Sequence, residues 1–506
     1  MTQVVIPKRP LILGGLLLGV IADVLLRAPG APGLNLALWA LALGGATGLL
    51  HRRKTGAPYP EATILVAGGV LLAATIAWRD SEALKLLALA GSATAFALPA
   101  YRAGASWVRR THVFEYGGAI AAAMASSAFG CLFLAFDGPD DSRAAPAAGV
   151  GWWRRLGPVL RGAALALPVL LVVGALFAAA DPVFADFMAR LVRFDLERIF
   201  EHLFVTGLFA WIATGYLRSF LGRSPLAEVG RLVSWRPSLG AGETATALAL
   251  LDLLFLVFVA VQLRTFFGGA AFVEATPGLS FAEYAREGFF ELVAVGAIVI
   301  PFLLAADQMM RRDSSRDERV FRALAGLQVL LLAAVMASAI QRLRLYLAEY
   351  GLTEARFFAA AFLGWLALLL VWFTATVLRG RRRPFAFGAL LMGFGWIAAL
   401  ILTNPDAAIV RANVAREGTG VEFDAAYVTR LSADAVPTLV ASLPALTPVA
   451  HCRVARSLLD RWGTPPMGDW RSWSLSAWRA RVVVARERVA LTAALGEMDD
   501  CPDGTT

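Results

Sequence analysis

The chain has 506 residues, of which 58 % are hydrophobic and only 17 % are charged, and its mean hydropathy is +0.64. This balance excludes an ordinary soluble globular protein, in which about a quarter of the residues are charged, and it predicts an all-α, polytopic membrane protein. The formal net charge of +9 arises in short loops beside hydrophobic segments, so it indicates contact with the anionic lipids of a bilayer and no nucleic-acid partner.

Hydrophobic segments follow one another from the N-terminus, each close to the roughly 20 residues that cross the hydrocarbon core of a bilayer. They lie at 11–26, 33–50, 62–78, 84–101, 117–136, 157–180, 199–221, 244–266, 288–309, 322–340, 356–378 and 384–402. Lys8 and Arg9 precede the first segment, and no persuasive small-residue cleavage site follows it. We therefore expect a retained first span and not a cleaved signal peptide.

Clusters of Lys and Arg occupy loops at 51–54, 102–110, 152–155, 218–236, 311–319 and 379–383. Basic loops stay on the cytoplasmic side, and these clusters cannot all do so if every hydrophobic segment crosses. The segment 117–136 is rich in Gly, Ala and Ser and has basic loops on both sides. Either one segment between 102 and 155 does not cross, or hydropathy misses an extra crossing. We favour the first, with 117–136 re-entrant or packed against its neighbours, which leaves about eleven crossings, a cytoplasmic N-terminus and a C-terminus outside.

Three acidic residues lie within hydrophobic segments, where ionisable side chains are costly and commonly functional: Asp23, Asp252 and Asp307. Asp252 is the strongest candidate for transport or proton relay, because it lies in the middle of LALLDLLFLVF with no charge near it in the sequence. A buried partner such as Arg264, Arg286 or Arg342 would lower its cost. Alternatively, a protonated Asp252 hydrogen-bonds a neighbouring helix and only holds the helices together.

The stretch SFAEYAREGFFEL at 280–292 places Glu283, Glu287 and Glu291 on one face of a helix. The first two fit a helix N-terminus, which stabilises acidic side chains. Glu291 lies about two turns deeper and should face a protein interior or a water-filled cleft.

Other polar residues occur in segments that the expected topology also places outside, at 181–198, 267–287, 342–356 and 404–439. If these segments meet, they form an outward polar cleft with Glu291 at its floor. The alternative is an ion-paired lid that only orders the helix ends. Besides the three glutamates, the candidate cleft residues are Asp181, Tyr284, Arg286, Arg344, Tyr346, Tyr350, Asn404 and Asp406.

Hydropathy falls after residue 403, so we divide the chain into a multi-span membrane domain at 1–403 and a helical C-terminal domain at 404–506, expected to be extracytoplasmic. The sequence LSADAVPTL predicts a helix with Ser432 as its N-cap and Asp434 in its first turn. Pro437 would either kink that helix or begin it. YGLTEARF predicts that one helix stops at Gly351 and another restarts after Thr353.

Two further features of the C-terminal domain each leave two interpretations open. Trp470, Trp473 and Trp478 are followed by several arginines, a combination that suits a membrane interface or a partner surface and also an aromatic core. Cys452 and Cys501 both lie in this domain. In an oxidising compartment they would be able to form a disulfide, and otherwise they are unrelated thiols.

The sequence lacks the motifs of common soluble enzymes. It has no Walker-type phosphate loop, no dinucleotide glycine fingerprint, no Gly-x-Ser-x-Gly elbow and no His-Glu-x-x-His. Its four histidines do not have metal-ligand spacing. We therefore predict no cofactor and no metal.

Four segments resemble, in the same order, the landmarks of a family of bacterial polytopic membrane proteins called domain of unknown function 4173. They are ADPVFADF at 180–187, SFAEYAREGFFEL at 280–292, RLRLYLAEYGLTEARF at 342–357 and NPDAAIVRANVAREGTGVEFDAAYVTRLSADAVPTL at 404–439. The resemblance covers residues 150 to 440 and implies a multi-pass protein of the bacterial cytoplasmic membrane. It implies no established activity.

Two classes of function remain. The favoured one is a non-enzymatic membrane protein, an envelope scaffold, sensor component or transporter, whose outer cleft binds an envelope protein or a lipid-linked ligand. The alternative is a membrane-embedded enzyme acting on a lipid-linked or envelope substrate. In that enzyme Glu291 or Glu287 would be the general base, and Arg286 or Arg344 would bind an anionic head group.

Overall fold

The computed structural model describes residues 8–27, 30–55, 60–101, 113–136, 181, 196–221, 238–274, 289–417, 423–464 and 469–496. Across these ranges the chain is helical, and its extended pairing is confined to an isolated bridge between Leu239 and Met310. Ten of the described helices are long and apolar enough to cross a membrane. The all-α, polytopic membrane class is therefore confirmed, while the hydrophobic segment 157–180 lies outside the described residues.

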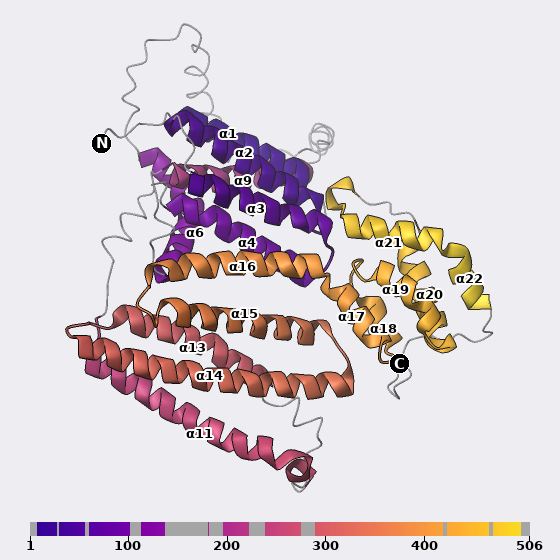
Figure 1. The fold of residues 1–506 in the computed structure, drawn as a ribbon. Coiled ribbons are helices and arrows are strands. Elements are labelled where there is room, and N and C mark those ends of the chain that lie inside the picture. The colour runs from indigo at the N-terminus through magenta and orange to yellow at the C-terminus, as the bar shows by residue number, and fades with distance from the viewer. Residues whose placement is uncertain are drawn as a thin grey trace, which may run out of the picture.

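The helices of the first half form one bundle (Figure 1): α1 (Lys8–Leu26), α2 (Leu34–Thr55), α3 (Pro60–Trp78), α4 (Glu82–Tyr101), α6 (Val113–Phe136) and α9 (Leu196–Phe220). α1 packs antiparallel against α9 through small residues, with Gly15 beside Thr214 and Gly19 beside Ala210. Small residues let two helix backbones approach closely, which is how helices associate where lipid removes the hydrophobic driving force.

A second bundle contains α11 (Ala241–Glu274), α13 (Phe289–Met309), α14 (Ser315–Tyr350) and α15 (Glu354–Thr376). Leu303, Phe321 and Phe373 are fully buried in its core. α16 (Arg383–Thr403) lies between the two bundles (Figure 1), where its Trp396 packs on Gly364 of α15 and its Ile397 packs beside Gly91 of α4. α16 therefore joins the two halves of the membrane domain.

Helix α6 contains most of the doubtful segment 117–136. Near its start, Tyr116 packs with Leu98, close to the end of α4. Near its end, Gly130 meets Gly215, close to the end of α9. The ends of α4 and α9 lie at the same level, because the Ser219 hydroxyl donates a 2.9 Å hydrogen bond to the Ala100 carbonyl. α6 thus lies obliquely over one end of this bundle, as expected of a segment packed against its neighbours.

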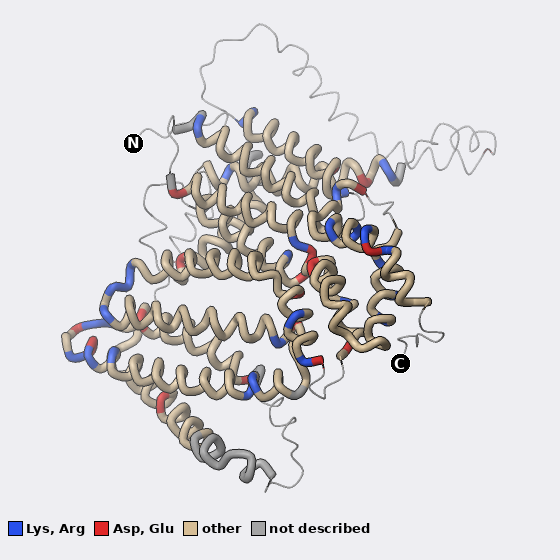
Figure 2. Tube along the Cα trace, turned by 45° about the vertical axis from the view of Figure 1, so that its right-hand side comes forward, with Lys and Arg blue, Asp and Glu red and all other residues tan. Residues whose placement is uncertain are grey.

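The helix ends form two sets. One set, the basic end, includes the ends of α2 and α4 and the loops 310–314 and 377–382; the other, the domain end, includes the turns 79–81 and 351–353 and the C-terminal domain. Figure 2 shows Lys and Arg gathered where α13 meets α14 and where α15 meets α16, away from that domain. The clusters at 51–54, 311–319 and 379–383 all belong to the basic end.

A salt-bridge network closes the basic end of the second bundle. Arg382 contacts Asp307 at 2.8 Å and Glu318 at 2.6 Å, and Arg312 contacts the same two carboxylates at 2.6 and 2.8 Å. The network ties the end of α13 to the start of α14 and to the loop before α16. Asp307 therefore has a structural role in holding these elements together.

At the opposite end of the first bundle, Asp23 is also paired. Its carboxylate lies 2.6 Å from His202 and 3.4 Å from Arg27. Because His202 belongs to α9 and Asp23 to α1, this contact ties the same two helices that pack through glycines. Asp252 is then the intramembrane acid that still requires an explanation.

The C-terminal domain is a compact set of short helices: α17 (Pro405–Val414), α18 (Ala425–Arg430), α19 (Val436–Ser442), α20 (Pro448–Trp462), α21 (Leu475–Arg486) and α22 (Arg488–Gly496), with 3₁₀ turns η1 (Leu443–Ala445) and η2 (Trp470–Ser472). Ile409, Val454 and Leu491 are fully buried in its core. Leu352 and Phe357, from the α14–α15 region, pack against the same core, so the domain rests on the membrane helices.

Two local expectations for this domain are corrected. Ser432 is not a helix N-cap, because α19 begins only at Val436 with Pro437 in its first turn. Asp434 consequently lies in the preceding turn, where it can reach outside the domain.

The aromatic-core interpretation of the Trp-rich stretch is also wrong. Trp470, Trp473 and Trp478 are all exposed, and the buried tryptophan of the domain is Trp462. The exposed side chains of Trp470, Trp473 and Trp478 can therefore contact lipid or a partner.

The cysteines differ in state. Cys452 is disulfide-bonded, and Cys131 is a free thiol. Cys501 lies outside the described residues. A disulfide in the C-terminal domain is a feature of proteins that mature in an oxidising compartment.

Candidate functional site

The turn between α3 and α4 binds the C-terminal domain chiefly through a buried carboxylate, that of Asp434, which is 3 % exposed. Its oxygens accept hydrogen bonds from the Arg79 guanidinium at 3.2 Å, from the backbone N–H groups of Asp80 and Ser81 at 2.6 and 3.0 Å, and from the Ser476 hydroxyl at 2.5 Å. The Asp80 carboxylate also accepts a 3.3 Å hydrogen bond from the Ala433 N–H of the domain. We call Arg79, Asp80, Ser81, Asp434 and Ser476 the junction.

Local sequence explains why these donors converge. α3 ends at Trp78 and α4 starts at Glu82. The Arg79 N–H still bonds the Thr75 carbonyl of α3, so Asp80 and Ser81 present their N–H groups at the start of α4, where an anion is stabilised. Arg79 also donates to the carbonyls of Ile401 and Leu402 at 2.8 and 3.5 Å. These carbonyls end α16, where the helix dipole favours a cation. Arg79 therefore connects α16 with the Asp434 carboxylate.

Asp406 lies beside the junction and is fully buried, at 0 % exposure. Its Oδ2 accepts hydrogen bonds from the backbone and hydroxyl of Ser432, while its Oδ1 has no hydrogen-bond partner among the described residues. The pKa of Asp406 is raised to about 6, chiefly by burial and in part by the nearby carboxylates of Glu354 and Asp434, while the hydrogen bonds from Ser432 act to lower it. Asp406 therefore titrates close to neutral pH.

Asn404 positions this acid. It adopts a left-handed conformation with φ of 52° and caps α17, its side chain accepting from the Ala407 N–H at 3.2 Å. Its amide also donates to the Asp434 carbonyl at 3.0 Å. Asn is among the residues that tolerate this conformation, so one side chain links the start of α17 to the junction.

The segments 342–356 and 404–439, two of the four segments considered for the outer cleft, come together in their described parts. α14 ends at Gly351, whose φ is 74°, and α15 restarts after Thr353. The Asn413 side chain both accepts from and donates to the Leu352 backbone, at 2.9 and 2.8 Å. The Tyr427 hydroxyl accepts from the Glu354 N–H at 2.7 Å. These hydrogen bonds order the helix ends beneath the C-terminal domain.

The remaining predicted cleft residues are placed as follows. Tyr346 and Tyr350 pack edge to face at 5.2 Å, and the Arg356 guanidinium lies 3.9 Å from the Tyr346 ring. Arg344 is exposed on α14, Glu291 is exposed at the start of α13, and Asp181 is exposed. Glu283, Tyr284, Arg286 and Glu287 lie outside the described residues. Asn404 and Asp406 are thus the predicted residues that lie at the junction.

Arg79, Asp80, Ser81 and Ser476 were not predicted. A signal was available in WRDSE at 78–82, where a very short polar break containing Arg separates two long apolar segments. A cation that close to the hydrocarbon indicates a buried partner.

The chemistry of the junction suits attachment. Both oxygens of Asp434 are engaged by donors from the protein itself, and removing one partner of such a buried pair typically costs about 3–5 kcal/mol. Among the described residues, no group of three or more His, Cys, Asp or Glu side chains could hold a metal ion.

Asp252 has a different environment, inside the second bundle. It is 4 % exposed, and neither of its oxygens has a hydrogen-bond partner among the described residues. Arg342 therefore does not hydrogen-bond it, and the side chains of Arg264 and Arg286 lie outside the described residues. Gln328 of α14 is fully buried and equally lacks partners for its amide among them.

The packing of α11 on α14 places Asp252 and Gln328 at similar depth. The two helices run parallel, because Leu248 borders the same small pocket as Phe321, and the Ser338 hydroxyl donates to Gln262 at 3.2 Å. The residues between these two contacts are matched in order along the parallel helices. Measured along the helix axes, Asp252 therefore lies within about one helical turn of the level of Gln328.

A family model described as Domain of unknown function (DUF4153) matches residues 66–442. The resemblance to domain of unknown function 4173 is corrected accordingly: the matching family is a different one, also of unknown function, and its match begins well before residue 150. No curated protein matches the chain, and no solved structure does. The match includes Arg79, Asp406 and Asp434 and spans most of the membrane helices. Because it covers well over half of the chain, the protein belongs to the family defined by the domain of unknown function DUF4153.

Proposed function

We propose that the protein is a non-enzymatic membrane scaffold that holds its C-terminal helical domain in a fixed position on the extracytoplasmic face. The junction carries this proposal, since the buried Asp434 carboxylate binds three consecutive residues of a turn between two membrane helices. Detaching the domain would take from Arg79 its carboxylate partner and from Asp434 the donors of the α3–α4 turn, in a region where unpaired charge is costly. The C-terminal domain therefore stays bound to the membrane helices.

Two observations support the orientation. The basic clusters at 51–54, 311–319 and 379–383 all lie at the end opposite the C-terminal domain, and basic loops are retained in the cytoplasm. The disulfide at Cys452 matches an oxidising, extracytoplasmic compartment. By this reasoning the N-terminus is cytoplasmic and the membrane is the bacterial inner membrane.

The exposed tryptophans indicate what the scaffold presents. The Leu34 N–H, at the start of α2, donates a 3.0 Å hydrogen bond to the Trp473 carbonyl, so this tryptophan lies at the level where a membrane helix begins. Trp470 is exposed nearby, and Trp478 lies one turn into α21. Tryptophan is enriched at membrane–water interfaces and in protein contacts. This surface would meet an envelope protein or a lipid-linked ligand close to the bilayer.

The orientation is tested by labelling single cysteines with a membrane-impermeant maleimide on intact cells. In a Cys131→Ser background, Thr492→Cys in α22 should label, and Ser315→Cys at the basic end should label only after lysis. The reverse pattern would place the C-terminal domain in the cytoplasm and end the proposal in this form.

The fixed position is tested by spin labels on Ala31, in the α1–α2 turn, and on Thr492. We expect a narrow distance distribution in the parent protein and a broad one after Asp434→Ala, with a smaller effect of Ser476→Ala, which removes one donor. Asp460→Ala, at an exposed acid of α20, serves as the control. A broad distribution in the parent would mean that the domain is not held.

A second candidate function, proton-coupled transport, is favoured by Asp252 and Gln328. A charged carboxylate buried beside an apolar helix costs several kcal/mol, whereas a protonated one can donate to the Gln328 amide oxygen. Infrared difference spectroscopy would detect the carboxylic acid band of Asp252, assigned by its loss in Asp252→Asn. A band that changes with pH supports proton relay, and one that stays constant over the accessible pH range leaves Asp252 as a structural hydrogen-bond donor.

A further inference from the structure

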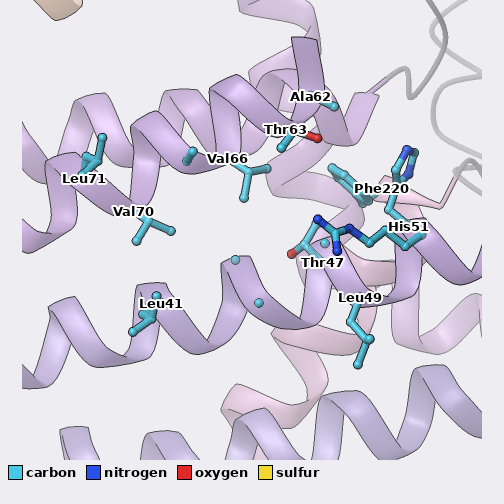
Figure 3. Close-up of a pocket in the computed structure, with 15 residues that line it drawn as sticks. Leu41, Thr47, Leu49, His51, Ala62, Thr63, Val66, Val70, Leu71 and Phe220 are labelled. Carbon is cyan, nitrogen blue, oxygen red and sulfur yellow. The ribbon is translucent and has the colours of Figure 1, made fainter. Parts of the chain in front are cut away.

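A long apolar groove runs along the outside of the first bundle between α2 and α3. Its volume is about 620 Å³. Leu41, Val70 and Leu71 lie toward one end of it, and Thr47, Thr63 and His51 lie toward the other (Figure 3). The groove therefore has an apolar end and a polar end.

Two glycines keep the groove open. A Cβ atom added to Gly45 or Gly48 would meet nothing within 4 Å, whereas one on Gly44 would lie 2.7 Å from a methyl group of Val70. Gly44 therefore serves close packing of α2 on α3, while Gly45 and Gly48 leave space. From Leu41 to Arg52 the groove extends about 16 Å along the helix axis, roughly half of the ~30 Å hydrocarbon core. That length matches an acyl chain of one leaflet.

The polar end carries excess positive charge. Arg52 lines the groove and is exposed, and the sequence near the end of α2 is HRRK. The formal charge of that sequence exceeds the single negative charge of Glu61 in the first turn of α3. Basic pockets between membrane helices on the cytoplasmic side bind anionic lipid head groups.

We propose that this groove binds one anionic phospholipid, with an acyl chain lying between α2 and α3 and the phosphate at Arg52. The apolar walls accept the chain, the open glycines provide the room, and Arg52 at the mouth selects a head group with net negative charge over a zwitterionic one. The proposal is independent of the function proposed for the C-terminal domain.

Native mass spectrometry of the full-length protein, purified with equal amounts of phosphatidylglycerol and phosphatidylcholine of identical chains, tests this. The parent should retain one phosphatidylglycerol. Gly48→Leu fills the groove and should abolish retention. Arg52→Gln should reduce the preference for phosphatidylglycerol about fivefold, the effect expected of one cation near a membrane surface. The control is Gly393→Leu on α16, where an added Cβ also meets open space.

Three outcomes would overturn the proposal. The first is equal retention of both lipids by the parent and by Arg52→Gln. The second is unchanged retention by Gly48→Leu in a protein that purifies like the control. The third is a parent dimer that Gly48→Leu converts to a monomer, because the groove would then hold a helix of a second copy.

Discussion

At the scale of single residues, the buried aspartates differ in the partners that their carboxylates have. Asp434 receives donors from two parts of the chain, Asp307 and Asp23 pair with cations, and Asp252 has no described partner. Asp406 is intermediate, with one oxygen bound by Ser432 and the other unsatisfied among the described residues. The pKa of this carboxyl group beside the junction is raised by its burial.

The protonation of Asp406 should make stability depend on pH. Its pKa of about 6 in the folded protein exceeds the ordinary value of 3.8, so the folded state holds the proton more tightly. The contribution of Asp406 to stability should then be fully present below about pH 4, fall as the pH rises to 6 and stay constant above it, a total loss of up to about 3 kcal/mol.

Asp406→Asn should remove this dependence and stabilise the protein at pH 7 by about 1–3 kcal/mol, because the amide oxygen can still accept from Ser432. Unfolding of the full-length protein in detergent between pH 4 and pH 8 measures the effect. Asp460→Asn, at an exposed acid, provides the comparison and should leave the pH profile intact. An Asp406→Asn profile identical to that of the parent would show that Asp406 does not titrate in this range.

Only some residues of this site could be predicted from the sequence. The prediction placed Asn404 and Asp406 among the outer polar residues, because their type and position after the last span were visible. It missed Arg79, since the partner of Arg79 lies 355 positions away and hydropathy carries no information on which loops meet. It also assigned Asp434 to a helix start, because Ser432 is a common N-cap residue, although the alternative that Pro437 begins the helix was available and is the one that α19 follows.

At the scale of elements, small residues decide which helices touch. A Cβ on Gly215 of α9 would lie 2.5 Å from the Ser126 carbonyl oxygen of α6. About two turns earlier on the same helix, a Cβ on Gly207 would meet nothing within 4 Å. The close packing of α6 on α9 therefore depends on the absence of a side chain at Gly215.

Gly215→Leu should force α6 away from α9. We expect it to lower the free energy of unfolding by about 1–3 kcal/mol, the usual cost of overpacking. Gly207→Leu is the matched control on the same helix and should have little effect. Thermal stability of detergent-solubilised protein, followed by size-exclusion chromatography after heating, distinguishes the two. Equal melting of both variants would contradict the close contact.

Hydropathy predicted the described spans but not all of their lengths. α14 covers Ser315–Tyr350, whereas the apolar segment is only 322–340, because Ser314 and Asp317 form a capping box that starts the helix in polar sequence. The lateral order of helices was not predictable in the same way. It depends on glycine contacts and on side chains such as Trp396, which do not alter the apolar character of a segment.

At the scale of the whole molecule, two helix bundles are held together by α16 and by the C-terminal domain. α16 contacts α4 on one side and α15 on the other, while the junction fixes the domain to the α3–α4 turn. Both connections join residues of the first bundle to residues that follow the second. The two halves should therefore recognise each other without a continuous chain.

Co-expression of fragments 1–230 and 231–506 tests this. A tag on the first fragment should recover the second from solubilised membranes, and Asp434→Ala in the second should lower the recovery severalfold. Asp460→Ala in the same fragment is the matched control. Failure of the fragments to associate, with both present in the membrane, would show that the described contacts are insufficient to join the halves.

The distance along the chain between Arg79 and Asp434 also bears on how the protein is made. The α3–α4 hairpin enters the membrane long before the ribosome reaches residue 434, so nascent protein carries an arginine at the mouth of the bundle with its carboxylate not yet synthesised. Ser476, which α21 supplies, is the last residue of the junction to be made. The junction is thus completed only late in synthesis, and a chain that stops before residue 434 leaves Arg79 without its carboxylate partner.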